Sequence, residues 1–206
     1  MEARLYRGFL NHELFGDDTV VNAHYPIRPH IRIKLFGLDI KRIETGGVGH
    51  QFVRQIADLK DDFHHFTVPG EYGYDPEGTR RELDLANDLF GDILPARMEG
   101  CCLSASPTMG VVHLMGMENM LYAMYDYPEL FLKMMDLVAD AHIGFFKFQE
   151  QNGLLMPTTG SERLWQGSWC FTDELPGPGE SDGRPLTTRE VWGYLDSQET
   201  VSISPQ

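Results

Sequence analysis

The sequence predicts an α/β fold in which strands and helices alternate along one chain. Three observations favour it. Ile31, Ile33 and Leu35 alternate with charged residues, as in a strand with one solvent-exposed face. Two later segments, beginning at Pro76 and Pro128, have apolar residues at helical spacing. Short apolar runs lie between and after them. The pattern fits a (β/α) barrel or a doubly wound sheet, and both alternatives stay open at this point.

The first 75 residues are predicted to be rich in β-structure. The extended stretch is Thr19–Leu38, which opens after a pair of aspartates. Thr45–Gly49 is rich in glycine and is typical of a loop or turn. Ala57–Asp62 is short and acidic, so we expect it to be exposed.

The first clear helix is predicted over Pro76–Phe90. Asp75 is a good N-cap residue, and a proline at the first helical position loses no hydrogen bond. Gly91 is expected to end the helix. Its apolar face consists of Leu83, Ala86 and Phe90.

A longer helix of about 24 residues is predicted to begin at Pro128 and to end at Asn152-Gly153. Between the two helices, the apolar runs Ile93–Met98 and Gly110–Met115 are predicted strands. The long helix has one apolar face, expected to pack against a sheet: Leu130, Phe131, Met134, Leu137, Val138, Ala141, Phe145 and Phe148.

The last 50 residues give weaker signals. Leu154–Met156 and Gly167–Phe171 are short apolar runs, and Leu175–Pro185 is a loop rich in glycine, proline and acidic residues. Arg189–Tyr194 is predicted to be a short helix capped by a threonine, and Glu199–Ile203 a strand.

Composition excludes several classes of protein. The net charge is −14, which repels phosphate backbones and anionic lipid, so we expect no nucleic-acid partner. No apolar run reaches the roughly 18 residues of a membrane helix, and Met1–Leu10 lacks the features of a signal peptide. The three cysteines, two of them adjacent, do not suggest a disulfide framework. A cytoplasmic protein is therefore expected.

Motifs for common cofactors are missing from the sequence. Gly46-Gly47-Val48-Gly49 does not match the Gly-x-Gly-x-x-Gly turn of dinucleotide-binding folds. There is no Gly-x-Ser-x-Gly turn for a serine nucleophile. The eight histidines are scattered, His64 and His65 are adjacent rather than on one helical face, and no Cys-x-x-Cys occurs. We therefore predict no metal site within these residues.

From Phe90 onward the sequence resembles the uroporphyrinogen decarboxylase superfamily, and the likeness extends weakly back to about Asp17. The similar segments are Phe90-Gly91-Asp92-Ile93-Leu94-Pro95, Met117-Glu118-Asn119-Met120-Leu121, Tyr125-Asp126-Tyr127-Pro128-Glu129-Leu130, and Val191-Trp192-Gly193-Tyr194-Leu195-Asp196-Ser197-Gln198-Glu199-Thr200 to Ser204-Pro205. The last of these is similar to an uncharacterised branch related to corrinoid methyltransferases.

The resemblance implies a (β/α)₈ barrel of the TIM type. A complete barrel takes about 250 residues, so we expect a single partial domain, incomplete at both ends. Residues 1–75 would form its β-rich lead-in and residues 76–206 its β/α units. Known members decarboxylate uroporphyrinogen or transfer methyl groups to or from corrinoids and thiols. The arginine-bearing N-terminal loop of true decarboxylases and the late zinc segment of methyl-transfer members are both missing here, so corrinoid or zinc is expected only in a complete protein.

Catalytic residues of a barrel follow the carboxyl ends of its strands. Asp173 and Glu174 are therefore the candidate general acids, with Trp169 as an aromatic neighbour that contacts substrate. Arg97 could bind a substrate carboxylate, and Glu99 could bind substrate or neutralise Arg97. Cys101 and Cys102 follow on the same segment.

A further candidate substrate-binding group is Asp196 and Gln198, with Glu199 beside them. Like the other candidates, they follow a predicted element of the barrel. The alternative interpretation for each group is structural: an acidic capping loop, a buried ion pair, or a turn leading into a strand.

The leading functional hypothesis is methyl transfer from a small donor to a corrinoid or thiol, with a corrinoid protein as a possible partner. The first alternative is uroporphyrinogen decarboxylation, which is disfavoured because 17 basic against 31 acidic residues suit a multiply carboxylated tetrapyrrole poorly. The second alternative is a non-catalytic remnant whose unpaired strand edges favour association, including homo-oligomers.

Overall fold

The computed structural model describes residues 1–16, 21–47, 50–158, 174–177 and 183–200. The chain is a mixed α/β protein, as predicted, with small sheets and no closed barrel in the described residues. It forms two compact units that are interleaved along the sequence. Unit 1 comprises Met1–Ile31, Tyr74–Cys102 and Gly153–Trp192, and unit 2 comprises Arg32–Gly73, Leu103–Asn152 and Gly193–Gln206. No described helix is both long and apolar enough to cross a membrane.

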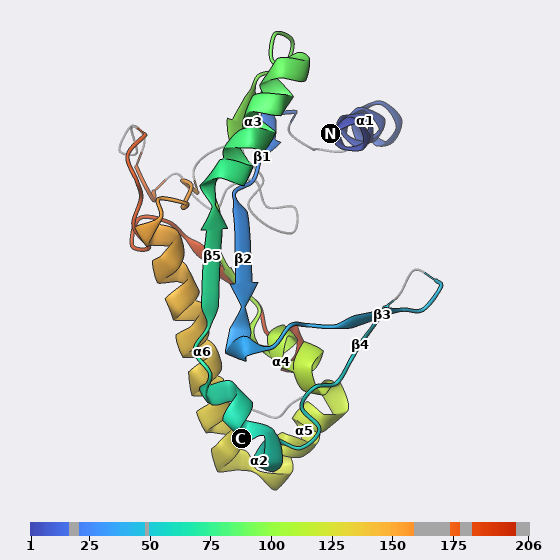
Figure 1. Cartoon of the computed structure of the whole chain (residues 1–206), viewed down its shortest axis with the longest axis vertical. Coiled ribbons are helices and arrows are strands. Elements are labelled where there is room, and N and C mark those ends of the chain that lie inside the picture. Colours follow the sequence, from blue (N-terminus) through green and yellow to red (C-terminus); the bar gives the residue numbers. More distant parts are fainter. Residues whose placement is uncertain (17–20, 48–49, 159–173, 178–182, 201–206) are drawn as a thin grey trace. The chain divides into compact units, whose positions relative to one another are not determined.

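Unit 1 is built on two parallel strands and the helix that precedes the second of them; Figure 1 labels the first strand, β1, and the helix, α3. Strand β1 (Tyr25–Ile27) pairs with β6 (Ala96–Met98), with Tyr25 opposite Ala96. Helix α3 (Pro76–Phe90) lies between them in sequence and packs against both. A strand, a helix and a parallel strand form the repeating unit of α/β folds.

Helix α3 confirms the prediction from its sequence. The side chain of Asp75 accepts a hydrogen bond from the backbone N–H of Gly78 at 2.8 Å, and Pro76 occupies the first turn. Ala86 is fully buried, and Leu83 and Phe90 pack against the same cluster. Burial of this apolar face against the two strands stabilises the helix.

A third extended segment continues the pairing in unit 1. Cys101 forms a parallel bridge with Leu155, in which its N–H donates to the Leu154 carbonyl and its carbonyl accepts from the Met156 N–H. Gly100 allows this approach, because a Cβ there would lie 2.7 Å from the Leu154 carbonyl oxygen. The chain from Ala96 to Cys101 therefore pairs in parallel with segments that precede and follow it.

Unit 1 begins with a helix that was not predicted from the sequence. Helix α1 (Glu2–Leu10) continues into a π-helical turn, η1 (Asn11–Phe15), and neither buries a residue. Arg4 connects α1 to β1: its Nη1 donates to the Pro26 carbonyl at 2.8 Å, and its guanidinium lies 5.2 Å from the Tyr25 ring centroid.

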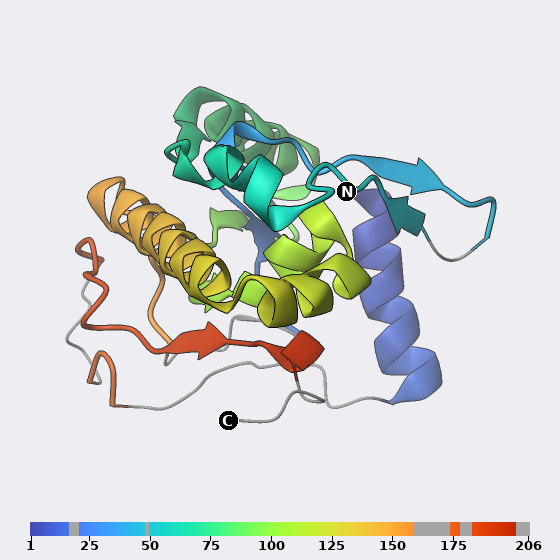
Figure 2. The same ribbon diagram turned by 90° about the horizontal axis from the view of Figure 1, so that it is seen from below.

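Unit 2 is organised around three consecutive helices (Figure 2): α4 (Pro107–Met115), α5 (Met117–Asp126) and α6 (Pro128–Gln151). The predicted bounds of α6 are confirmed.

The predicted strand Gly110–Met115 is wrong, because it lies in α4. Pro107 supplies a helix start, and Val111, Leu114 and Met115 share a buried face at helical spacing. Gly116, with φ of 80°, turns the chain between α4 and α5.

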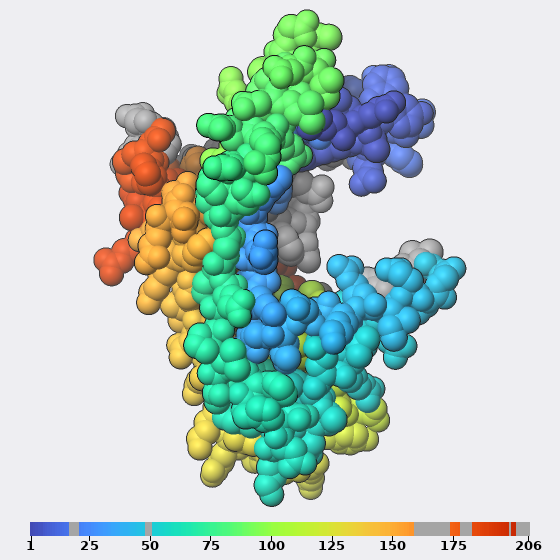
Figure 3. All heavy atoms as spheres, in the orientation of Figure 1, coloured from blue at the N-terminus to red at the C-terminus, as the bar shows by residue number. Residues whose placement is uncertain are grey.

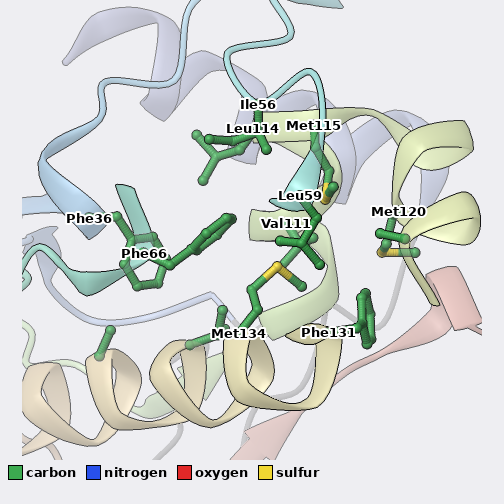
Figure 4. Packing of buried hydrophobic residues seen from close by; sticks show 13 residues of the cluster. Phe36, Ile56, Leu59, Phe66, Val111, Leu114, Met115, Met120, Phe131 and Met134 are labelled. Carbon is green, nitrogen blue, oxygen red and sulfur yellow. The ribbon is translucent and has the colours of Figure 1, made fainter. Parts of the chain in front are cut away.

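The core of unit 2 lies between these helices and the short helices α2 (Leu59–Asp62) and η3 (Phe63–Thr67), with the turn η2 (Leu35–Gly37). Figure 4 shows its side chains converging from all of these elements. The labelled core residues are Phe36, Ile56, Leu59, Phe66, Val111, Leu114, Met115, Met120, Phe131 and Met134. Methionine side chains fill part of this core, and one of them, Met134, belongs to the predicted apolar face of α6.

Tyr72 packs on the C-terminal half of α6. Its ring centroid lies 5.6 Å from that of Phe145 and 5.8 Å from that of Phe148, and its hydroxyl donates to the Ala141 carbonyl. Gly144 leaves room for this contact, because a Cβ there would lie 2.9 Å from the Tyr72 hydroxyl oxygen. Burial raises the pKa of Tyr72, so the hydroxyl stays protonated and donates.

The strands of unit 2 form two separate pairs. β3 (Arg42–Glu44) and β4 (His50–Phe52) make an antiparallel hairpin that projects from the helices of the unit (Figure 3). β7 (Leu103–Ala105) pairs in parallel with β8 (Gly193–Leu195). Two further strands, β2 (His30–Lys34) and β5 (Glu71–Asp75), pair with each other, and each runs from one unit into the other.

The predicted helix Arg189–Tyr194 is wrong. Residues 187–191 form a turn, and the following residues enter β8. Glu190 fixes the turn: its carboxylate accepts from both the N–H and the hydroxyl of Thr187 at 2.9 Å, and it pairs with the Arg184 guanidinium. These local bonds to the backbone compete with helix formation. The predicted strand Glu199–Ile203 begins within a helical turn, η4 (Gln198–Thr200), and its last three residues lie outside the described part.

The contacts of Glu190 lead to a pH-dependent stability. The Arg184 and Thr187 hydrogen bonds lower the pKa of Glu190 from 4.5 to about 2. The stabilisation is therefore complete above the unfolded-state value and is lost as the pH falls through the folded-state pKa of about 2. We expect Glu190→Gln to lower the melting temperature at pH 7 and this deficit to become much smaller as the pH falls to 2. Thermal denaturation followed by circular dichroism at both pH values tests this. Asp140→Asn, at an exposed position in the middle of α6, is the control, and a Glu190→Gln deficit equal at both pH values would contradict the prediction.

Candidate functional site

A buried histidine–glutamate pair in unit 1 is the first candidate site. His24 Nε2 lies 3.2 Å from Glu99 Oε1, and the two side chains are 12% and 5% exposed. Glu99 is held by the parallel ladder, because its N–H donates to the Ile27 carbonyl at 2.8 Å. Burying a carboxylate is costly unless it is paired and hydrogen-bonded, so His24 compensates for the burial of Glu99.

The sequence predicted Glu99 as a candidate but not its partner. Arg97, the expected partner, is exposed on β6, whereas His24 precedes β1. The two members of the pair are separated by 75 positions. The signal available in the sequence was His24 next to the apolar strand Tyr25–Ile27, which is too weak to identify a partner.

The cysteines beside this pair differ in exposure. Cys102 is buried and Cys101 is half-buried. Burial raises the pKa of the Cys102 thiol, while its own backbone N–H and the charge of Arg28 act in the opposite direction. A thiol with a raised pKa is a poor nucleophile and a poor metal ligand, so Cys102 is best described as a small apolar core residue.

A second polar cluster lies in unit 2 at the carboxyl ends of β7 and β8. The two strands are parallel, so the segments that leave them meet at one edge. The Asp196 N–H donates to the Ala105 carbonyl at 3.1 Å and extends the ladder. Beyond it, the Thr108 hydroxyl in the first turn of α4 donates to Glu199 Oε2 at 2.6 Å. Thr108 is 5% exposed and Glu199 is half-buried, so this hydrogen bond is partly buried.

Glu199 suits acid–base chemistry at this position. Thr108, in the first turn of α4, fixes one carboxyl oxygen of Glu199. A carboxyl group held at the end of parallel strands can give or take a proton from a bound molecule. Its neighbours Asp196 and Gln198 were the predicted site residues, and Glu199 was named beside them.

The remaining predicted residues are not brought together by the described part of the chain. Asp173 and Trp169 lie outside the described residues, as does the side chain of Gln198. Glu174 is described and exposed. The predicted roles of Asp173, Glu174 and Trp169 therefore stay predictions. Glu99 and Glu199, in contrast, have hydrogen-bond partners in the structure.

Two buried polar atoms on α6 were not foreseen. His142 Nε2 and Gln149 Oε1 have no hydrogen-bond partner in the described structure, and Gln149 is 3% exposed. Burial lowers the pKa of His142, which favours its neutral form. The signal in the sequence was their spacing of seven residues, which puts two polar side chains on one face of a largely apolar helix.

The fold and these clusters define an α/β protein with parallel strand pairs and two separate polar groups, one in each unit. Within the described residues, no three His, Cys, Asp or Glu side chains are placed to hold a metal ion. No family model, no curated protein and no solved structure matches the chain.

Proposed function

We propose that the chain is part of a uroporphyrinogen decarboxylase-like enzyme of the cytoplasm that transfers a methyl group from a small donor to a corrinoid or thiol. The observation that supports it is the parallel pairing of strands that are joined through helices. β1 pairs with β6, and α3, which directly precedes β6, packs against both; Cys101 pairs with Leu155 across α4–α6, and β7 pairs with β8. Such crossovers are the building units of a (β/α)₈ barrel, of which this chain would be an incomplete part.

In this proposal Glu199 is the general acid. Its protonated carboxyl gives a proton to the leaving group of the donor as the bond between that group and the methyl breaks, and the methyl forms its new bond to the acceptor. Thr108, through its hydrogen bond to Oε2, orients the carboxyl group. The described residues do not form a metal-binding cluster, so the proposal assigns the acceptor to a partner or to residues beyond those described.

The test is methyl transfer by the purified protein. Reduced corrinoid is mixed with a panel of O-, N- and S-methyl donors, and methyl–cobalt formation is followed by absorbance. We expect Glu199→Gln to lower the rate by about 10²-fold, as is typical of the loss of a general acid. Glu129→Gln, at an exposed position on α6, is the matched control and should leave the rate unchanged.

Two outcomes would overturn the proposal. No methyl–cobalt signal with any donor would exclude this reaction, and an unchanged rate in Glu199→Gln would exclude the assigned acid. A parallel assay with uroporphyrinogen distinguishes the decarboxylase alternative, because release of carbon dioxide would assign the chain to that branch of the superfamily.

A further inference from the structure

The hairpin of unit 2 has a strand edge that pairs with no other strand in the described residues. β3 pairs with β4 on one side, and the two form a sheet of their own. All three residues of β3, Arg42, Ile43 and Glu44, are exposed. In the turn that follows, a Cβ on Gly46 or Gly47 would meet no described atom within 4 Å. An uncovered strand edge is a template for pairing with another strand.

The backbone groups on this open edge belong to Arg42 and Glu44. The Lys41 carbonyl accepts a hydrogen bond from the Val53 N–H at 2.9 Å, so Lys41 faces β4. In an antiparallel ladder, successive residues direct their N–H and C=O groups alternately to the two sides of the strand. Ile43 therefore faces β4 as Lys41 does, and the N–H and C=O groups of Arg42 and Glu44 face outward, toward the place of a further strand.

The side chains of β3 select the strand that fits there. Arg42 and Glu44 carry opposite charges on one face of the strand, because they are two residues apart. Neither has an ion-pair partner within the part of the chain that the structure describes. An antiparallel copy of β3 centred on Ile43 places Arg42 opposite the partner's Glu44, and Glu44 opposite the partner's Arg42. Parallel pairing in register would instead set like charges against each other, which is destabilising.

The same arrangement satisfies the backbone. With a two-fold axis at Ile43, Arg42 and the partner's Glu44 exchange two hydrogen bonds, and the symmetric pair exchanges two more. The two Ile43 side chains meet on the opposite face of the sheet, at the closely spaced position of the ladder. Ile43 is 54% exposed, so this contact removes apolar surface from water. A contact that is complementary to itself in this way closes as a symmetric dimer.

We propose that β3 is a dimerisation edge, on which a second copy of this chain pairs in antiparallel orientation through Arg42, Ile43 and Glu44. Three residues on each side make a small interface, so the dimer is weak, and its exposed ion pairs make it sensitive to salt. The other strand of the hairpin, His50–Phe52, has no pair of opposite charges and offers no such fit. The inference does not depend on the proposed methyl transfer, because Glu199 lies on another segment and the test below uses no methyl donor.

Sedimentation velocity on the full chain tests the dimer. We expect a reversible equilibrium between monomer and dimer that is visible at about 1 mM protein and shifts toward monomer as the salt concentration rises. Arg42→Glu and Glu44→Arg each set like charges against each other at both ends of the pairing. Each should therefore raise the dissociation constant by at least about tenfold. A chain that stays monomeric at about 1 mM, or single variants that dimerise as the unsubstituted chain does, would overturn the proposal.

Two rescue experiments distinguish this register from any other contact. The double variant Arg42→Glu/Glu44→Arg exchanges the charges and restores both ion pairs, so it should dimerise like the unsubstituted chain. An equimolar mixture of the two single variants should form a heterodimer, because each acidic position then faces a basic one. The unsubstituted chain carries a net charge of −14, so both single variants stay strongly negative and general attraction does not bring them together. Failure of either rescue would contradict the assigned register.

Lys133→Glu is the matched control. Lys133 is exposed on α6, and its substitution changes the net charge as much as Arg42→Glu does. This variant should dimerise like the unsubstituted chain. Equal losses of dimer in Lys133→Glu and Arg42→Glu would assign the effect to net charge and refute the pairing of β3. Circular dichroism verifies that each variant folds, and heterodimer formation in the mixture is a second check, because it requires an intact hairpin in both chains.

Discussion

Replacement of Met134 by alanine is expected to lower the free energy of unfolding by about 3 kcal/mol. Met134 is fully buried in the core of unit 2, where its side chain lies between α4 and α6 (Figure 4). Truncation removes apolar surface from the core and leaves a cavity that the surrounding helices fill only in part. Urea denaturation followed by circular dichroism measures the change.

The matched control is Leu132→Ala on the same helix. Leu132 is 66% exposed, so its truncation should change the free energy of unfolding by no more than about 0.5 kcal/mol. Both substitutions place alanine on α6, so helix propensity changes little and burial is the variable that differs. Equal destabilisation by the two variants would show that the described core of unit 2 is incorrect.

The second large effect is expected at the buried pair of unit 1. His24→Leu removes the partner of a carboxylate that is 5% exposed, and should destabilise the protein by about 3 kcal/mol. The double variant His24→Leu/Glu99→Leu should recover most of this loss, because it removes the unpaired buried charge as well. A double-mutant cycle of urea denaturation curves measures the coupling free energy.

The same cycle distinguishes a buried pair from two independent residues. If the effects of His24→Leu and Glu99→Leu simply add, the two side chains do not interact in solution, and the first candidate site loses its basis. Arg97→Leu, an exposed neighbour on β6, is the control and should have a small effect.

Local sequence patterns predicted the helices whose ends and buried faces are marked by residues within the helix or directly beside it. For α3, Asp75 and Pro76 give the start and Ala86 marks the buried face. For α6, Pro128 and Asn152 give the two ends. For Gly110–Met115 a local pattern led to the wrong prediction of a strand, because a short apolar run fits a strand or a buried helix equally well. Pro107 was the overlooked start signal.

The candidate sites could be predicted only in part. Position after a predicted strand drew attention to Glu99, and position after the segment Arg189–Tyr194, wrongly predicted to be a helix, drew attention to Asp196 and Glu199. Their partners, His24 and Thr108, are 75 and 91 positions away and have no local signal. The open edge of β3 was not foreseen either, because a strand of three residues is too short to show a periodic pattern.

The sequence by itself therefore determined the mixed α/β class, the two long helices and their apolar faces, because caps and periodicity act over one or two helical turns. Only the tertiary structure decided which strands pair, which carboxylates are buried and which side chains compensate for their burial. The physical reason is that pairing and desolvation depend on residues far apart in the chain, which no local pattern specifies.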